Sequence, residues 1–136
     1  MFEGEWKAGE AEGRGTERCA DGSVFEGEWK AGGREGRGTV RYPSGNVFEG
    51  EFKANEQEGR GTTRLASGEA GVGTYRANTL VGVGVVWTAD RQTAWRLLDC
   101  QAQPEISLGD ARALAAEIGL PVPPPHHAQY LVARIE

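Results

Sequence analysis

The amino-acid sequence predicts a mainly β fold of stacked β-hairpins, capped by one short C-terminal α-helix. Three observations lead to this prediction. A unit of 23 residues repeats without gaps from residue 2, apolar residues within each unit alternate with a period of two, and helical apolar spacing appears only near the C-terminus. We predict a hairpin array over residues 2–98 and a C-terminal part over residues 104–136, which holds the helix, a proline-rich spacer and a tail.

The repeat is the strongest of these signals. The first two units, residues 2–24 and 25–47, are identical at 16 of 23 positions, and two further units follow at residues 48–70 and 71–93. The fourth unit is degenerate but keeps its glycines in register. The fifth position is aromatic in every unit: Trp6, Trp29, Phe52 and Tyr75. Periods of this length are typical of repeat architectures.

Each unit has the pattern of a β-hairpin. In the second unit, Phe25 and Trp29 fall on one face of an outgoing strand, and charged residues fall on the other face. The turn that follows contains residue types that tolerate a positive φ: Gly9, Gly32, Asn55 and Asn78. The return strand alternates again, and a second turn leads to the next unit. After the fourth unit, the period predicts a terminal strand at about residues 93–98.

The glycines inside the strands need a physical reason, because glycine normally weakens a strand. We expect them to leave room for the fifth-position ring to lie flat over the neighbouring strand, which buries about 150–250 Å² of aromatic surface. On this interpretation the stretch VGVGVVW, residues 81–87, is the fourth return strand and not a phosphate-binding loop.

The second unit, FEGEWKAGGREGRGTVRYPSGNV at residues 25–47, resembles a MORN repeat. The pattern of that family is an aromatic-x-Gly-x-aromatic strand, a glycine turn and a Gly-x-Gly strand. The resemblance covers residues 2 to about 93 and implies an elongated, single-layer antiparallel sheet. It also implies a scaffold that links cytoskeletal, membrane-associated or signalling partners. Some family members carry the repeats as an accessory segment beside a catalytic domain.

The polar face of the predicted sheet carries acidic outgoing strands and basic return strands, so we expect cross-strand ion pairs. The alternative is a lipid surface, because the family's name refers to membrane occupation and phosphoinositide binding has been proposed for it. Residues 2–93 hold 12 basic and 15 acidic residues. This charge disfavours anionic lipid, which attracts basic clusters.

The predicted helix covers about residues 108–118. Ser107 and Asp110 have capping-box spacing before it, and Gly119 and Pro121 end it. In the fourth unit, apolar residues replace the charged ones of the polar face, and an exposed apolar patch needs a cover. We expect the helix to dock there, as a permanent or a displaceable cap. The residues expected beneath it are Val72, Val83, Val85, Trp87, Trp95 and Leu97.

The segments beyond the helix give weaker signals. Residues 120–125 indicate polyproline II, interpreted as a spacer and not an SH3 ligand because no Lys or Arg lies close by. His126 and His127 are interpreted as a linker pair without a third metal ligand. Tyr130, Leu131, Val132 and Ile135 form an apolar segment, either strand or helix, that returns to the sheet or contacts a partner.

Composition excludes several classes of function. The chain has 15 basic and 20 acidic residues, a net charge of −5, which argues against nucleic-acid binding. No apolar run approaches the roughly 18 residues that span a bilayer, and the N-terminus lacks a signal sequence. The sequence has no catalytic grouping, no disulfide framework and no metal-ligand or phosphate-loop motif. We therefore expect a cytoplasmic protein, associated with cytoskeleton or membrane, with no catalytic residue, cofactor or metal.

The function predicted is a non-catalytic scaffold that binds protein partners of unknown identity. The contact surface is expected on the aromatic-glycine face, where the sheet would bury the rings only in part. Its expected anchors are Phe25, Trp29, Tyr42, Phe48 and Phe52. The alternatives are a phosphoinositide-dependent membrane module and a regulatory segment of a larger enzyme. The unpaired first strand adds a further hypothesis, in which either the chain self-associates at this N-terminal edge or preceding repeats are missing.

Overall fold

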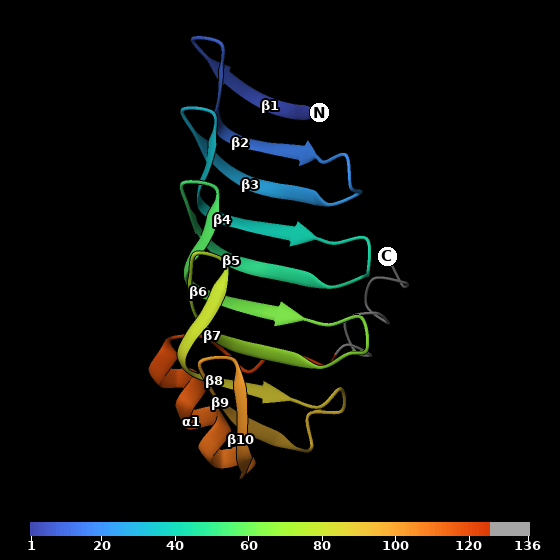
Figure 1. The fold of residues 1–136 in the computed structure, drawn as a ribbon, viewed down its shortest axis with the longest axis vertical. Helices are drawn as coiled ribbons and strands as arrows, with labels where there is room; N and C mark the ends of the chain where they lie inside the picture. The colour runs from blue at the N-terminus through green and yellow to red at the C-terminus, as the bar shows by residue number, and fades with distance from the viewer. Residues whose placement is uncertain (126–136) are drawn as a thin grey trace.

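A computed structural model describes residues 1–125 of the chain. Ten strands form one antiparallel sheet in sequence order, and this confirms the predicted mainly β sheet of stacked hairpins (Figure 1). One helix, α1 (Leu108–Ile118), is present in these residues. The strands are β1 (Phe2–Lys7), β2 (Glu10–Arg18), β3 (Val24–Lys30), β4 (Gly33–Arg41), β5 (Val47–Lys53), β6 (Glu56–Arg64), β7 (Ala70–Arg76), β8 (Thr79–Trp87), β9 (Ala94–Leu98) and β10 (Gln101–Ile106).

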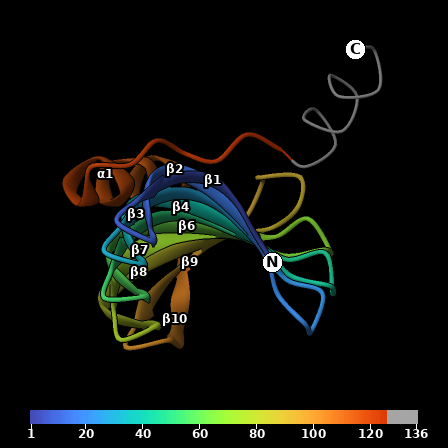
Figure 2. The same cartoon turned by 90° about the horizontal axis from the view of Figure 1, so that it is seen from above.

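The sheet is bent into an arch along its whole length. Seen from above, α1 and the segment that follows it lie over the outer side of the arch (Figure 2). We call the sheet face beneath α1 the outer face and the opposite face the inner face. The bend coincides with a register shift in each hairpin, such as the one between Gly27 and Trp29 in β3. Irregularities of this kind increase the local bend and twist of a strand.

In each of the first four return strands, one glycine with a positive φ allows this bend. Gly36 has φ +91°, and Gly59 has φ +104°. A Cβ on Gly36 would overlap the carboxylate of Glu28, whose Oε1 accepts a 2.6 Å hydrogen bond from the backbone N–H of Arg37. These glycines are thus required by positive φ and by a glutamate, and they do not form sockets for aromatic rings.

The hairpin turns are two-residue turns with positive φ at both residues. In the second hairpin, Ala31 has φ +50° and Gly32 has φ +82°; in the third, Ala54 has φ +51° and Asn55 has φ +71°. This geometry is that of a type I′ turn, whose twist matches that of the flanking strands. The predicted positive φ at the Gly and Asn position is confirmed, while the preceding alanine also adopts the left-handed region.

The fifth hairpin departs from the period, and this overturns part of the predicted docking surface. The loop before β9 spans residues 88–93, one residue longer than the loop at residues 65–69. Trp87 therefore pairs with Ala94, and Val86 pairs with Trp95. A shift of one residue exchanges the faces of a strand. Trp95 and Leu97 thus lie on the inner face, and their expected place beneath α1 is wrong.

The helix docks on the outer face of β7, β8 and β9. Val72, Val85 and Trp87 are buried there with Ala94, Ala111 and Ala115. Val83 shares this face and is half-buried, but it lies outside the cluster. Ser107 Oγ accepts a 3.0 Å hydrogen bond from the N–H of Asp110, and Gly119 ends the helix with φ +95°. The predicted short C-terminal helix is therefore confirmed.

The hairpin of β9 and β10 was predicted only in its first half. β10 pairs with β9 and contains Pro104. Proline cannot donate to a strand ladder and is confined to edges of sheets. The strand's polar composition hides it from a search for apolar alternation. In residues 1–125, no helix has the length and apolar content needed to cross a membrane.

Candidate functional site

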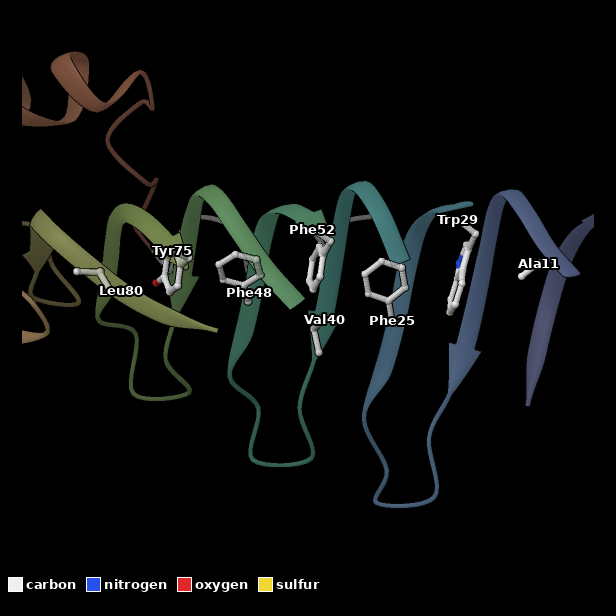
Figure 3. Close-up of a cluster of buried hydrophobic side chains, with 8 residues drawn as sticks. All are labelled: Ala11, Phe25, Trp29, Val40, Phe48, Phe52, Tyr75 and Leu80. Carbon is white, nitrogen blue, oxygen red and sulfur yellow. The ribbon is translucent and has the colours of Figure 1, made fainter. Parts of the chain in front are cut away.

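The inner face holds a continuous ladder of aromatic rings (Figure 3). The first-position phenylalanines Phe2, Phe25 and Phe48 alternate with the fifth-position rings. Phe25, for example, lies edge to face with Trp29 at 5.3 Å and with Phe52 of the next unit at 4.9 Å between ring centroids. Such pairs contribute about 0.5–1.5 kcal/mol each beyond burial. The full order is Trp6, Phe2, Trp29, Phe25, Phe52, Phe48 and Tyr75.

The ring that fills the glycine socket is the first-position phenylalanine. A Cβ on Gly38 would overlap the ring of Phe25, and a Cβ on Gly61 would overlap the ring of Phe48. The prediction that the fifth-position ring lies over these glycines is therefore wrong. The fifth-position ring stands between two phenylalanines instead, and in Trp29 the indole Nε1 donates a 3.2 Å hydrogen bond to the carbonyl of Gly15.

Four of the five expected binding anchors lie in the core. Phe25, Trp29, Phe48 and Phe52 are buried, and Tyr42 is 39% exposed. The expectation of partial burial is wrong for the four rings, because neighbouring rings cover both sides of each and the arch closes around them. They stabilise the array and are not free for a partner.

The fourth unit interrupts the ladder. Gly71 stands where the other units have phenylalanine, and Leu80 lies over the glycines in its place, with Cδ1 2.8 Å from a Cβ built on Gly73. Leucine fills less space than a phenyl ring. A hollow of about 460 Å³ opens beside it on the inner face. Its lining residues are Thr63, Leu65, Ala70, Gly71, Tyr75, Asn78, Thr79, Leu80, Val86, Leu97 and Cys100.

Tyr75 forms one wall of this hollow. Its ring contacts Phe48 at 4.9 Å, and residue 71 supplies no ring on its other side. The hydroxyl shares a 2.6 Å hydrogen bond with Thr63 Oγ1. Burial raises the pKa of Tyr75, and the bond to Thr63 opposes that rise, so the hydroxyl stays protonated at neutral pH. The Cys100 thiol donates to the carbonyl of Leu80 at 3.2 Å.

The polar part of the outer face contains fewer ion pairs than predicted. Within residues 1–125, the ion pairs are Arg60 with Glu51 at 3.7 Å and, on the inner face, Arg34 with Glu17 at 2.9 Å. Glu28 of β3 and Glu51 of β5 accept hydrogen bonds from backbone N–H groups at the bends. Two shallow polar hollows of about 250 and 360 Å³ lie on this face among Arg14, Glu26, Thr39 and their neighbours.

Arg91 attaches the proline-rich segment to the sheet. The side chain is 8% exposed, and its Nε and Nη2 donate to the carbonyls of Pro123 and Pro124 at 2.9 and 2.8 Å. Its Nη1 donates to the carbonyls of Gly68, Thr88 and Ala89. Burial, and then the nearby Arg64, lowers the pKa of Arg91, and Asp90 raises it. These bonds, together with the packing of Leu120 and Val122 on the helix cluster, hold the segment at residues 120–125 against the sheet.

A departure from the repeat marks Arg91 in the sequence. It stands where the other units have Gly22, Gly45 and Gly68, and it keeps their left-handed conformation with φ +62°. A non-glycine residue there costs roughly 1–2 kcal/mol. Comparison of the units would have singled it out, as it would have singled out Gly71 and Leu80.

Replacing Arg91 with glycine is expected to detach residues 120–125 although it restores the repeat's glycine. The change relieves the left-handed strain but removes five hydrogen bonds from a buried cation, so we expect a net loss of about 1–3 kcal/mol in the free energy of unfolding. Thermal unfolding gives this value. Methyl NMR should show loss of the contacts that Val122 makes with the helix cluster. The exposed Arg76, changed to alanine, is the control, and unaltered Val122 contacts in Arg91→Gly would contradict the assigned role.

The described part of the chain contains no cluster of metal-ligating side chains and no disulfide bond. No group of three or more His, Cys, Asp or Glu side chains in residues 1–125 is placed to hold a metal ion. Cys19 and Cys100 are both free thiols. His126, His127, Tyr130, Leu131, Val132 and Ile135 lie outside the described residues.

Comparison with known families gives one match. A family model described as MORN repeat matches residues 2–24, 25–47 and 48–70, the same boundaries as the first three units. A comparison with curated proteins found no match for the chain. The matched residues are the three units that have a phenylalanine at the first position and an aromatic ring at the fifth. The fourth unit, which holds the hollow and the helix-docking surface, lies beyond them.

Proposed function

Because the chain belongs to the MORN-repeat family, we propose that it is a non-catalytic scaffold that binds another protein on the inner face of its sheet. Repeats of this family are commonly protein- or membrane-interacting. The observation that supports a protein partner is the hollow in the fourth unit, where Leu80, Val86 and Leu97 line an open apolar surface. Exposed concave apolar surfaces of this kind are typical of binding sites.

The charge of the chain favours a protein over an anionic membrane. The net charge is −5, whereas phosphoinositide surfaces select clusters of Lys and Arg. The outer-face arginines alternate with glutamates, as in Arg37 and Glu28. Co-sedimentation with liposomes at low and high salt tests the preference for a protein partner over a membrane. Salt-resistant binding that needs phosphoinositide would reverse this preference.

We propose a cytoplasmic location for the scaffold, because free thiols such as those of Cys19 and Cys100 persist there.

Site-specific photo-crosslinking tests the protein-binding role. A benzophenone amino acid at Thr79, which is exposed beside the hollow, is expected to crosslink a protein in native cells. The same group at Glu26, exposed on the outer face, is the matched control. Products from both positions alike, or from neither, would count against the inner face as the binding surface. A crosslink to a catalytic protein would favour the alternative of a segment that regulates an enzyme.

A second proposal concerns self-association through β1. This edge strand has β2 as its only neighbour among the described strands, and its Trp6 is 58% exposed. The opposite edge, β10, is blunted by Pro104. We propose that two copies pair β1 with β1, which closes a dimer instead of extending a filament. Antiparallel pairing centred on Gly4 sets Phe2 opposite Trp6 of the second copy, which prolongs the aromatic ladder.

Light scattering over a range of concentrations tests whether two copies pair through β1. The chain should approach the mass of a dimer as its concentration rises, and Trp6→Lys should remain monomeric. Leu98→Lys places the same charge on an exposed apolar residue at the other end of the sheet and should leave the dimer intact. A monomer at all concentrations would rule out the β1 pairing.

A further inference from the structure

The hollow in the fourth unit is a vacant ring position of the aromatic ladder. Trp29 and Phe52 each stand between two phenylalanine rings. Tyr75 contacts one, Phe48, and the residue that would supply the second ring is Gly71. In the first three units, the group that packs against the fifth-position ring is thus a phenyl ring of the chain itself.

The walls of the hollow suit a ring that enters from outside. Leu80 covers the glycines at the base, and Val86 and Leu97 add aliphatic walls. The volume of about 460 Å³ lies in the range of small binding pockets, and it exceeds that of a single ring. It therefore holds an aromatic side chain together with part of the segment that carries it.

Acidic residues stand next to the lining residues. Asp99 Oδ1 accepts a 2.7 Å hydrogen bond from the N–H of Gly82, and Glu56 Oε2 accepts a 3.5 Å hydrogen bond from Asn78 Nδ2 of the lining. The arginines that adjoin lining residues along the chain, Arg64, Arg76 and Arg96, alternate to the outer face. Together with the net charge of −5, these carboxylates favour a positively charged partner segment.

From these contacts we infer that the hollow receives an aromatic side chain of a partner polypeptide, flanked in that partner by basic residues. The incoming ring lies edge to face with Tyr75 and continues the ladder in trans. This inference rests on the proposed protein-binding function and specifies the partner's chemistry at one position.

Short peptides test the inference on the full chain. The probes share the sequence acetyl-Lys-Ala-X-Ala-Lys-amide, with X as phenylalanine, cyclohexylalanine or alanine, and binding is followed by two-dimensional NMR. The phenylalanine peptide should shift the signals of Tyr75, Leu80, Val86 and Leu97 in a saturable way. It should bind about two- to tenfold more tightly than the cyclohexylalanine peptide, because an edge-to-face pair adds to simple burial. The alanine peptide should bind at least tenfold more weakly than the phenylalanine peptide.

The double variant Gly71→Phe with Leu80→Gln fills the hollow with the chain's own ring. It reproduces the third unit, where Phe48 and Gln57 hold these places. Gly71 pairs with Val86 as Phe25 pairs with Val40. A Cβ on Gly71 lies 3.1 Å from the carbonyl oxygen of Val85, so the neighbouring strand must shift by a few tenths of an ångström to admit the ring. The double variant should lose binding of the phenylalanine peptide at least tenfold. Leu98→Gln makes the same leucine change at an exposed outer-face position and should bind as the parent does.

Each other outcome overturns the inference. Equal binding of the three peptides would show that the site does not recognise an aromatic ring. Binding unaffected by the double variant would show that the peptide does not bind in the hollow. Absence of binding, restored by Tyr130→Ala, would make a ring of the chain itself the occupant. If none of these peptides binds while the Thr79 crosslink persists in the double variant, the aromatic anchor is wrong and the scaffold function stands.

Discussion

Replacing Trp87 with aspartate is expected to release α1 from the sheet and to lower the free energy of unfolding by at least about 3 kcal/mol. Trp87 is 2% exposed and packs in the cluster that includes Ala111 and Ala115 of the helix. The change removes a large buried ring and leaves a carboxylate without a partner. An isolated helix of 11 residues is too short to persist in water.

Limited proteolysis with trypsin measures the release. Arg112 lies on the exposed side of α1, so cleavage there needs an unfolded helix. Cleavage at Arg112 should become at least tenfold faster in Trp87→Asp. Leu114→Asp, made on the helix itself, should give the same cleavage and leave the sheet folded. Thr74→Asp places the same carboxylate at an exposed position of β7 and should change neither rate nor stability by much. An unaltered rate at Arg112 in both aspartate variants would show that the cluster does not hold the helix.

Replacing Gly38 with alanine is expected to destabilise the array by about 1–3 kcal/mol, the usual cost of overpacking a core. The new methyl group would overlap the ring of Phe25, which is 1% exposed and has no room to move away. Urea unfolding gives the free energy. In a background of Phe25→Val the same glycine change should cost little, because the next nearest atom, the carbonyl oxygen of Glu26, is 3.5 Å from the added Cβ.

Gly109→Ala is the control for this cycle. A Cβ there meets only Ser107 Oγ at 3.9 Å, and alanine is the better residue inside a helix. This variant should be more stable by about 0.4–1 kcal/mol, opposite in sign to Gly38→Ala. If Gly38→Ala costs as much without the Phe25 ring as with it, the glycine acts through its backbone and not as a socket.

The fourth unit changes both faces of the sheet at once. On the outer face, Trp87 and Val85 replace an arginine and a threonine and support the helix. On the inner face, Gly71 replaces a phenylalanine and opens the hollow. The helix covers the apolar residues of the outer face, while the hollow of the inner face stays open. Under the proposed function, this open surface is the one offered to a partner.

The sequence by itself determined the repeat, the hairpins and the helix. These follow from local patterns: a period of two within strands, turn residues such as Gly32 and Asn55 that tolerate positive φ, and the Ser107 cap with Gly119 at the helix end. Each of these signals depends on neighbours within one unit. The MORN family, the open antiparallel sheet and the short capping helix could therefore be predicted without coordinates.

Only the tertiary structure decided which side chains are open to a partner. One extra residue in the loop before β9 moves Trp95 and Leu97 to the inner face, and the period could not show this because every earlier loop is shorter. The arch and the ladder bury Phe25 and Phe48, although a single flat layer would expose them. Burial depends on contacts between units, while periodicity reports only which face a residue takes. For that reason the face of a residue was predictable within the four repeat units, and the hollow between Tyr75, Leu80 and Leu97 was not.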